Sequence, residues 1–371
     1  MKRAIRKNIL RLRGKIKRSD FLFSLRRRFI DRDLQREKKL MKQSVEKSPE
    51  TVKAEIDAYK KYWKCRPDDY IRYGLFRKNL TPEEILDYIP MHYYYCDFYE
   101  KIFPNLLKKE DLENKLAQYQ KFRSRGVKVP EVVAVIKGNS LSHPEDSSAT
   151  VSLKTVTDAL ADGEKYFIKP TDGRCGFGIK VIKRRDGRLY DGEKIIESVA
   201  DLELDSATEY IIQRQLIQRE DLSAVNASTL NTLRTIVTYY NGKPRIVGII
   251  LRIGRAGAFV DNSGQGGISV AVDLETGRFA PYAGREHGGG TFDRHPDTGY
   301  VFAQGGIKDW PKVRSEIYDI VSKFTDYGVL GWDIAIGSDG VYAVEYNLGF
   351  GIEHAQTILG GMRRRLEISV D

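Results

Sequence analysis

The sequence contains few of the residues that form covalent crosslinks. Its 371 residues include only three cysteines, Cys65, Cys96 and Cys175. They lie far apart, with neither paired nor metal-ligand spacing, so we expect no disulfide framework and no cysteine-based metal site. This pattern is typical of a reducing compartment, and it predicts a cytoplasmic location.

Long apolar runs are also missing from the sequence. No stretch approaches the roughly 20 apolar residues that a helix needs to cross a bilayer. Residues 1–17 lack the apolar core of a signal peptide. The sequence shows no internal repeat and no extended low-complexity segment. A chain of 371 residues can bury a sizeable core, and its length allows about two domains.

Positive charge is concentrated at the N-terminus. The formal net charge is +11, yet residues 1–48 contain 18 Lys or Arg and five Asp or Glu, which leaves −2 for the rest of the chain. Such an arm can bind an anionic membrane, with about 1 kcal/mol from each cation near the surface. Docking to a glycan-assembly partner and a solvated helical extension are alternatives. Nucleic-acid binding would use the same charges, but we do not expect it, because no recognition motif accompanies them. Apolar residues interleave with the charges at roughly helical spacing, at Leu10, Leu12, Ile16, Phe21, Leu22, Leu25, Phe29 and Ile30.

Residues 49–110 are expected to form a helical module. The run Thr81-Pro82-Glu83-Glu84 indicates a helix start, with threonine as the cap, proline in the first turn and acids near the positive end of the helix dipole. An unusually aromatic segment follows at residues 89–99. Its tyrosines either pack the module onto the next lobe or stack on a sugar acceptor.

The segment at residues 331–347, GWDIAIGSDGVYAVEYN, predicts a hairpin. Residues 338–340 are typical turn residues, and the flanking segments alternate like half-buried strands. If these three residues form the loop, Asp333 lies directly opposite Glu345, and Asn347 follows on the same face. Opposed carboxylates destabilise a sheet unless positive charge lies between them. The hairpin therefore predicts a site for Mg²⁺ carried in with a nucleotide, the alternative being a solvated acidic strand edge.

A second pattern, at residues 166–182, has the features of a phosphate-binding loop. An apolar strand leads to Lys169, and Gly173, Gly176 and Gly178 follow before a second strand. Glycines let backbone N–H groups approach phosphate oxygens closely, and the lysine supplies positive charge. The spacing excludes a Walker loop and a dinucleotide fingerprint. The segment therefore predicts a phosphate cradle between two strands, or else a glycine-rich hairpin without function.

Together these patterns resemble the ATP-grasp family over roughly residue 115 to the C-terminus. The resemblance implies two α+β lobes with ATP between them. Lys115, which follows Asn114 at the start of a helix, and Lys169 are similar to the family's two ATP-binding lysines. The family often has a glutamate in the hinge strand where this chain has glutamine. The resemblance also implies ATP contacts from Arg174, Gly176 and Gly178 in a flexible lid, adenine and ribose contacts from Gln213, Gln215 and Leu216, and Mg²⁺ ligation by Asp333, Glu345 and Asn347.

The segment at residues 227–273 narrows the resemblance to one branch. Its motifs around Arg234, Arg252, Asp261-Asn262 and residues 264–267 are similar to α-L-glutamate ligase-related proteins, also called sugar-transfer-associated ATP-grasp proteins. Alternation predicts that Arg234 and Arg252 project from neighbouring strands of one sheet toward the nucleotide. There they would neutralise charge on a γ-phosphoryl group or an acyl phosphate; otherwise they are surface residues. Asn262, Gly266 and Gly267 are expected to contact substrate, an ordinary turn being the alternative.

Residues 284–296 combine glycines and charges with two histidines eight residues apart, His287 and His295. The glycines predict a mobile loop. We interpret it as an acceptor-side loop in which Arg285 and His287 contact substrate. The alternative is an exposed turn.

These patterns predict an α+β protein with an ATP-grasp fold after a helical N-terminal region. We expect a basic arm at residues 1–48, a helical module at 49–110, a first ATP-grasp lobe at 111–210 and a second lobe with the Mg²⁺ site at 211–371. The implied activity is ATP-dependent joining of a carboxylate to an amine through an acyl phosphate, in polysaccharide or cell-envelope glycan biosynthesis. Lys169, Arg234 and Arg252 would stabilise the oxyanions. The alternatives are a kinase that phosphorylates a sugar hydroxyl and a non-catalytic nucleotide-binding scaffold. The basic arm would suit a cytoplasmic protein at the inner membrane face.

Overall fold

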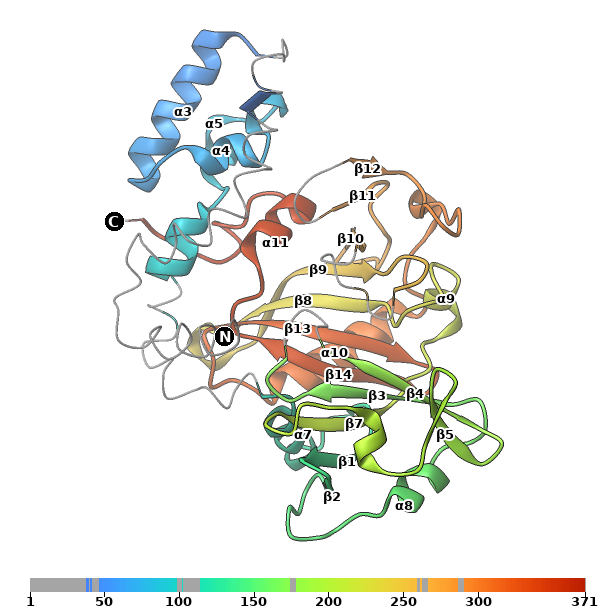
Figure 1. Ribbon diagram of the computed structural model, residues 1–371. Coiled ribbons are helices and arrows are strands. Elements are labelled where there is room, and N and C mark those ends of the chain that lie inside the picture. The colour runs from blue at the N-terminus through green and yellow to red at the C-terminus, as the bar shows by residue number, and fades with distance from the viewer. Residues whose placement is uncertain are drawn as a thin grey trace. The chain divides into compact units, whose positions relative to one another are not determined.

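The computed structural model describes residues 38–39, 41, 47–98, 102, 114–173, 178–258, 261, 266–285 and 290–370. The chain divides into two compact units (Figure 1). One unit comprises residues 1–108, 284–290 and 351–371, and the other comprises residues 109–283 and 291–350. Apart from residues 38–39, 41 and 47–48, the predicted basic arm lies outside the described residues.

The first sheet of the larger unit is antiparallel throughout, with the strand order β2-β1-β7-β3-β4-β5-β6. Apolar side chains on its two faces pack against different helices. Ile168 and Ile212 pack with Val156 of α8, whereas Ile211 packs with Tyr119 of α7. Neighbouring residues of one strand point to opposite faces, which explains this division. The elements are α7 (Lys115–Ser124), β1 (Val132–Lys137), β2 (Ser140–Ser142), α8 (Leu153–Asp158), β3 (Lys165–Pro170), β4 (Lys180–Arg185), β5 (Arg188–Asp191), β6 (Lys194–Ile196), η5 (Val199–Leu202) and β7 (Glu209–Arg214).

The second sheet has the strand order β12-β11-β10-β9-β8-β13-β14. The pairings from β10 through β9, β8 and β13 to β14 are antiparallel. Helix α10 packs against β14, and Phe324, which follows α10, joins Trp332 of β13 in an aromatic cluster with ring centroids 5.0 Å apart. The elements are α9 (Glu220–Ser223), β8 (Thr232–Thr238), η6 (Tyr240–Gly242), β9 (Arg245–Ile253), β10 (Ile268–Val272), β11 (Ala283–Gly284), β12 (Thr291–Phe292), η8 (Phe302–Gln304), α10 (Trp310–Ser322), β13 (Val329–Gly337) and β14 (Gly340–Asn347).

The predicted hairpin is formed by β13 and β14, but its loop has two residues rather than three. Gly337 pairs with Gly340, whose φ of 137° is one that side-chain-bearing residues rarely adopt. A bulge at Val344 then shifts the register by one residue, so Asp333 lies opposite Glu345. The predicted opposition of the two carboxylates is confirmed, although a bulge rather than a longer loop produces it. The predicted alternation is wrong for β13, where every residue is buried.

The smaller unit contains the predicted helices and the last helix of the chain. Thr81 and Glu84 form the predicted capping box, because the Thr81 hydroxyl accepts from the Glu84 N–H and the Glu84 carboxylate accepts from the Thr81 N–H. The buried Gln356 side chain bonds to both the N–H and the carbonyl of Ile89. The last helix is thereby fastened to the helical module. The elements are α3 (Pro49–Trp63), α4 (Asp68–Arg72), η1 (Leu75–Arg77), α5 (Pro82–Leu86), the π-helical turn η2 (Tyr93–Phe98) and α11 (Ile352–Leu359).

The two units do not coincide with the predicted domain boundaries. The boundary expected between residues 210 and 211 falls inside β7, a central strand of the first sheet, and residues 351–371 group with the helical module. Within the part of the chain that the structure describes, no helix has the length and apolar character needed to span a membrane.

Candidate functional site

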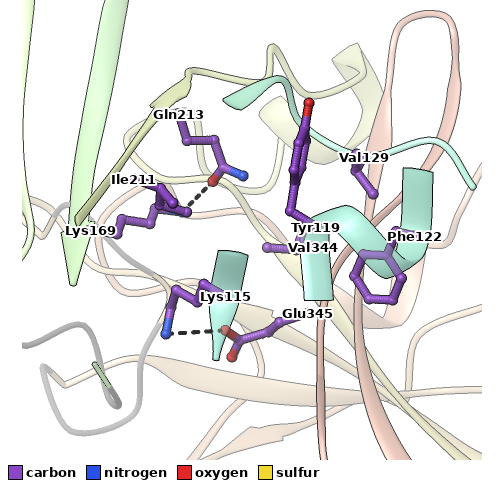
Figure 2. Close-up of a pocket in the computed structure, with 9 residues that line it drawn as sticks. All are labelled: Lys115, Tyr119, Phe122, Val129, Lys169, Ile211, Gln213, Val344 and Glu345. Carbon is purple, nitrogen blue, oxygen red and sulfur yellow. Dashed lines mark hydrogen bonds and ion pairs between the residues drawn. The ribbon is translucent and has the colours of Figure 1, made fainter. Parts of the chain in front are cut away.

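A pocket in the larger unit is lined by α7, β3, β7 and β14, so both sheets contribute to it (Figure 2). Its empty volume, which includes space open to solvent, is about 320 Å³. Charged and apolar side chains face each other across it. The lining residues are Lys115, Tyr119, Phe122, Val129, Lys169, Ile211, Gln213, Val344 and Glu345.

The apolar wall of the pocket comes mainly from one face of α7. Tyr119 and Phe122 follow Lys115 by four and seven residues, a spacing that places all three on one side of a helix. The ring of Phe122 stacks on Trp332 with centroids 5.7 Å apart, so it is held in place by the second sheet. The bulged residue Val344 completes the wall from β14. These apolar residues were not predicted as site residues, although the helical spacing from Lys115 indicates two of them.

Lys169 extends from β3 into the pocket. Its ammonium donates to the side-chain oxygen of Gln213 on β7 at 2.7 Å, and the Gln213 amide donates to the Pro130 carbonyl at 3.3 Å. The second bond orients the amide so that its oxygen faces the lysine. Burial lowers the pKa of Lys169 to about 8; nearby Glu345 opposes this shift and Lys115 adds to it. The charged ammonium would therefore be stabilised by an anion in the pocket.

Lys115, the first residue of α7, joins the glycine loop to the pocket. Its ammonium donates to the Gly173 carbonyl and lies 3.8 Å from Oε2 of Glu345. Asn114 caps the helix by accepting from the Ala117 N–H at 3.0 Å. The Asn114 amide also donates to the Asp172 carboxylate at 2.9 Å. Lys115 and Lys169, which are far apart in sequence, thus both lie near the carboxylate of Glu345.

The opposed carboxylates of β13 and β14 lie between two sets of cations. Asp333 contacts arginines, whereas Glu345 lies near lysines. The Asn347 amide is 3.5 Å from Oε1 of Glu345, so all three predicted metal ligands gather at the end of the hairpin. Neighbouring cations explain how two carboxylates can face each other on a sheet without unfolding it.

Arg234 and Arg252 extend from neighbouring strands, β8 and β9, and both bond to Asp333. Nε and Nη2 of Arg234 donate to the two carboxylate oxygens at 2.6 and 3.2 Å, and Nη1 donates to the Phe350 carbonyl at 2.9 Å. Nη1 of Arg252 donates to Oδ2 of Asp333 at 3.0 Å. Burial raises the pKa of Asp333, but the two arginines outweigh it and lower the pKa to about 2. Asp333 is therefore ionised at neutral pH.

Asp261, which belongs to the Asp261-Asn262 motif but was given no role from the sequence, extends this arrangement. Its Oδ2 accepts from the Thr232 N–H at 3.0 Å and from the Thr232 hydroxyl, and its Oδ1 lies 3.4 Å from Nη2 of Arg252. Burial raises the pKa of Asp261, while Arg252 and the bonds from Thr232 oppose that rise. Asp261, Arg252, Asp333 and Arg234 thus form a row of alternating charge along the second sheet, which we call the charge row.

The remaining predicted residues divide into four groups. Gly178 adopts φ +77°, and a Cβ there would lie 3.2 Å from Cγ of Pro170, so this end of the glycine loop closes over β3. Gln215 and Leu216 follow the end of β7 and do not line the pocket; the Gln215 N–H donates to the Lys165 carbonyl at 3.0 Å. Gly266 and Gly267 immediately precede β10, and Arg285 belongs to the smaller unit. Arg174, Gly176, Asn262 and His287 lie outside the described residues.

His295 is a structural residue of the larger unit. Its side chain is buried, with Nε2 3.0 Å from the Gly254 carbonyl. Its Nδ1 accepts from the N–H groups of Asp297 and Thr298, each at 3.3 Å. This pattern requires the neutral tautomer with the proton on Nε2. His295 therefore holds a turn together and has no position available for metal binding.

Asp333, Glu345 and Asn347 supply the oxygen donors that Mg²⁺ prefers. Among the described residues, no group of three or more His, Cys, Asp or Glu side chains could hold a metal by itself. Asp333 already accepts three hydrogen bonds from arginines, which occupy most of the roughly four lone-pair positions of a carboxylate. The residues therefore fit an ion held mainly by Glu345 and Asn347, with phosphate oxygens or water at the other positions.

Two sheets enclose a pocket that contains two lysines and the carboxylate of Glu345. The model of the family described as sugar-transfer associated ATP-grasp matches residues 95–367, and this chain belongs to that family. The predicted α+β fold class is thereby confirmed. No curated protein matches the sequence.

Several solved structures are similar to the chain at low identity. Carboxyaminoimidazole ribonucleotide synthase from Aspergillus clavatus, complexed with ATP, is 13% identical with a TM-score of 0.38, over 72% of this chain and 55% of that one. D-alanine-D-alanine ligase from Helicobacter pylori is 12% identical with a TM-score of 0.38, over 69% and 59%. L-amino acid ligase from Bacillus licheniformis is 10% identical with a TM-score of 0.37, over 81% and 53%. The match thus spans little more than half the length of each.

Proposed function

We propose that the protein is an ATP-dependent ligase that binds ATP in the pocket between its two sheets. The observation that carries this proposal is the convergence of Lys115, Lys169 and Glu345 on one pocket from three separate chain segments. The lysines would bind phosphate oxygens, and the apolar wall suits a purine base. Gln213, which lines the pocket, is a proposed adenine or ribose contact, and Gln215 and Leu216 are proposed to contact the part of the nucleotide that extends beyond the lining residues. Family membership supports this use of the pocket.

The proposed metal ligands are Glu345, Asn347 and one oxygen of Asp333. Bound Mg²⁺ would neutralise phosphate charge and hold the phosphates in a reactive arrangement. The protein's own contribution would be alignment and charge. Lys169 would bind the α- and β-phosphates, while Arg234 and Arg252 would face the γ-phosphoryl end from β8 and β9.

The proposed reaction has two steps. A substrate carboxylate oxygen attacks the γ-phosphorus and ADP leaves, which produces an acyl phosphate. An amine then attacks the acyl carbon, loses a proton and displaces inorganic phosphate. Developing negative charge in both steps would be stabilised by the ammonium of Lys169 and by the two guanidinium groups of the charge row. No protein side chain becomes covalently modified.

The substrates are proposed to be a carboxylate and an amine carried on sugars or glycan precursors. The family description, sugar-transfer associated, supports this class. In the larger unit, Gly266 and Gly267, together with Asn262, are the proposed acceptor contacts. Arg285 and His287 belong to the smaller unit, and their contact with substrate stays a separate prediction. A cytoplasmic protein held at the inner membrane face by residues 1–48 would meet such precursors, and the net +13 of that arm supports the proposal.

Separate measurement of ADP and inorganic phosphate tests the reaction class. The protein would be incubated with Mg-ATP and pools of amino acids, sugar acids and nucleotide sugars. A ligase releases equal amounts of both products, and only when a carboxylate and an amine are present. ADP without free phosphate, with phosphate recovered on a sugar, would replace the ligase by a kinase. Nucleotide binding without turnover in any pool would favour a scaffold.

A matched pair of variants tests the proposed metal ligands. Glu345→Gln keeps the shape of the side chain and removes its charge, and we expect a loss of about 100-fold or more in Mg²⁺-dependent turnover. Glu316→Gln is the control, because Glu316 accepts from the Val341 N–H of the same hairpin at 3.0 Å but does not line the pocket. Equal turnover in Glu345→Gln and the wild type would remove Glu345 from the mechanism.

A further inference from the structure

We propose that Asp261 is a positioning residue that holds Arg252 in the orientation needed to contact the γ-phosphate of ATP. This inference rests on the proposed function, because it assigns the nucleotide to the pocket between the sheets. It adds a residue that contacts neither ATP nor metal and acts through its neighbour.

The two oxygens of Asp261 have different partners. Oδ2 is fixed to strand β8 by the N–H of Thr232 at 3.0 Å and by the Thr232 hydroxyl. Oδ1 is thereby aimed at Nη2 of Arg252, 3.4 Å away. Since Thr232 is the direct cross-strand partner of Arg252, one residue pair of the sheet positions both the carboxylate and the guanidinium.

Arg252 is consequently held from two sides. Nη1 donates to Asp333 and Nη2 faces Asp261, so the terminal nitrogens of the guanidinium are directed at different carboxylates. Contacts at both terminal nitrogens restrict rotation of the planar group. Arg234 is oriented without a contact to Asp261, because its Nε and Nη2 both donate to Asp333 and its Nη1 donates to the Phe350 carbonyl.

The location of Asp261 places this arrangement beside the phosphate site. Asp261 is only 8% exposed, and the side chain of Arg252 is 11% exposed. Lys169 lines the pocket, and the Asp261 carboxylate lies close enough to it to oppose in part the lowering of its pKa by burial. A carboxylate this close to the polyphosphate would repel it and weaken binding, unless the carboxylate also contributes an interaction that offsets the repulsion. Orientation of Arg252 is a purpose that the geometry supports.

A double-mutant cycle with two nucleotides tests the proposal. Dissociation constants of Mg-ATP and Mg-ADP would be measured by calorimetry for the wild type, Asp261→Asn, Arg252→Ala and the double variant. We expect Asp261→Asn to weaken ATP binding about tenfold, which is about the contribution of one charge-assisted hydrogen bond from Arg252 to the γ-phosphate. Binding of ADP, which has no γ-phosphate, should be unchanged. In the Arg252→Ala background, Asp261→Asn should have no further effect on the ATP-to-ADP affinity ratio.

Asp297→Asn is the matched control. Asp297 pairs with Arg255 through two bonds of 2.7 and 2.8 Å in the same unit, but neither residue belongs to the charge row. Its loss should leave the ATP-to-ADP affinity ratio unchanged. Thermal unfolding of every variant separates local effects from loss of the fold.

The outcomes distinguish this inference from the proposed function. If the wild type binds neither nucleotide, the proposed function fails and the inference fails with it. If the wild type binds both but Asp261→Asn retains the wild-type ratio, only the inference is refuted. If Asp261 had only a structural role, Asp261→Asn would weaken the binding of ATP and ADP equally. The loss would then be the same whether or not Arg252 is present.

Discussion

The pKa of Lys169 predicts that ATP affinity falls in mildly alkaline solution. Burial lowers this pKa to about 8, well below the value of 10.5 expected for an exposed lysine. Phosphates bind the ammonium and not the neutral amine, so proton loss from Lys169 competes with nucleotide binding. The expected change lies between about pH 7.5 and 9.5, where an exposed lysine would remain charged.

The magnitude follows from the fraction of Lys169 that is protonated. With a pKa of about 8, roughly nine tenths of the side chains are charged at pH 7 and roughly one tenth at pH 9. ATP should therefore bind about tenfold more weakly at pH 9, a loss of about 1.4 kcal/mol. The stability of the nucleotide-free protein changes with pH in the opposite direction. Between about pH 8 and 10.5 the unfolded chain binds more protons at this lysine than the folded one, so its contribution to stability rises with pH.

The assay is a titration of Mg-ATP at constant ionic strength across this pH range. Lys169→Arg is the control, because a guanidinium stays charged throughout and its ATP affinity should be nearly independent of pH. Lys169→Met should bind ATP weakly at every pH. If the wild-type dissociation constant is the same at pH 7.5 and 9.5, or if Lys169→Arg shows the same slope, another group controls binding and the reasoning about Lys169 is refuted.

Three further predictions concern the sheet, the hairpin and the arm. Asp333→Asn should lower the free energy of unfolding by about 3–5 kcal/mol, since it leaves two buried arginines without their shared carboxylate. Urea denaturation measures this loss, and Asp339→Asn, on the exposed hairpin loop, should cause a far smaller one. Gly331→Ala should cost about 1–3 kcal/mol or more, because the new Cβ would lie 2.2 Å from Cβ of Phe350; an unchanged melting temperature would contradict that packing. Deletion of residues 1–48 should abolish most binding to anionic vesicles while ATP affinity is retained; vesicle binding that persists would show that the arm is not the anchor.

Local patterns in the sequence predicted those parts of the site that depend on neighbouring residues. Turn residues and alternation indicated the hairpin, and the structure confirms that Asp333 faces Glu345. The capping pattern placed Asn114 at the start of α7, where its side chain accepts from the Ala117 N–H. Such features depend on backbone geometry within a few residues, so a single sequence contains the information that determines them.

Features that depend on distant segments could not be predicted in this way. The bulge at Val344 replaces the expected three-residue loop, and its position is determined by pairing with β13. The contact between Lys169 and Gln213 joins two strands whose adjacency is a property of the whole sheet. Asp261 belongs to the charge row only because Thr232 and Arg252 are cross-strand partners. Each of these requires a strand order that periodicity alone does not provide.

The charge arrangement explains how the site can fold before a nucleotide arrives. Among the described side chains around the pocket, two lysines and two arginines accompany three carboxylates. Unpaired cations at this density would repel one another, and the carboxylates offset most of that repulsion in the nucleotide-free protein. The offset is uneven, because both arginines are paired tightly with Asp333, whereas Lys115 is 3.8 Å from Glu345 and the hydrogen bond of Lys169 within the described residues is to the neutral amide of Gln213. Incoming phosphates would therefore displace the fewest existing bonds at the lysines, so we expect the lysines to contribute most to ATP affinity and the arginines to contribute most to the transition state.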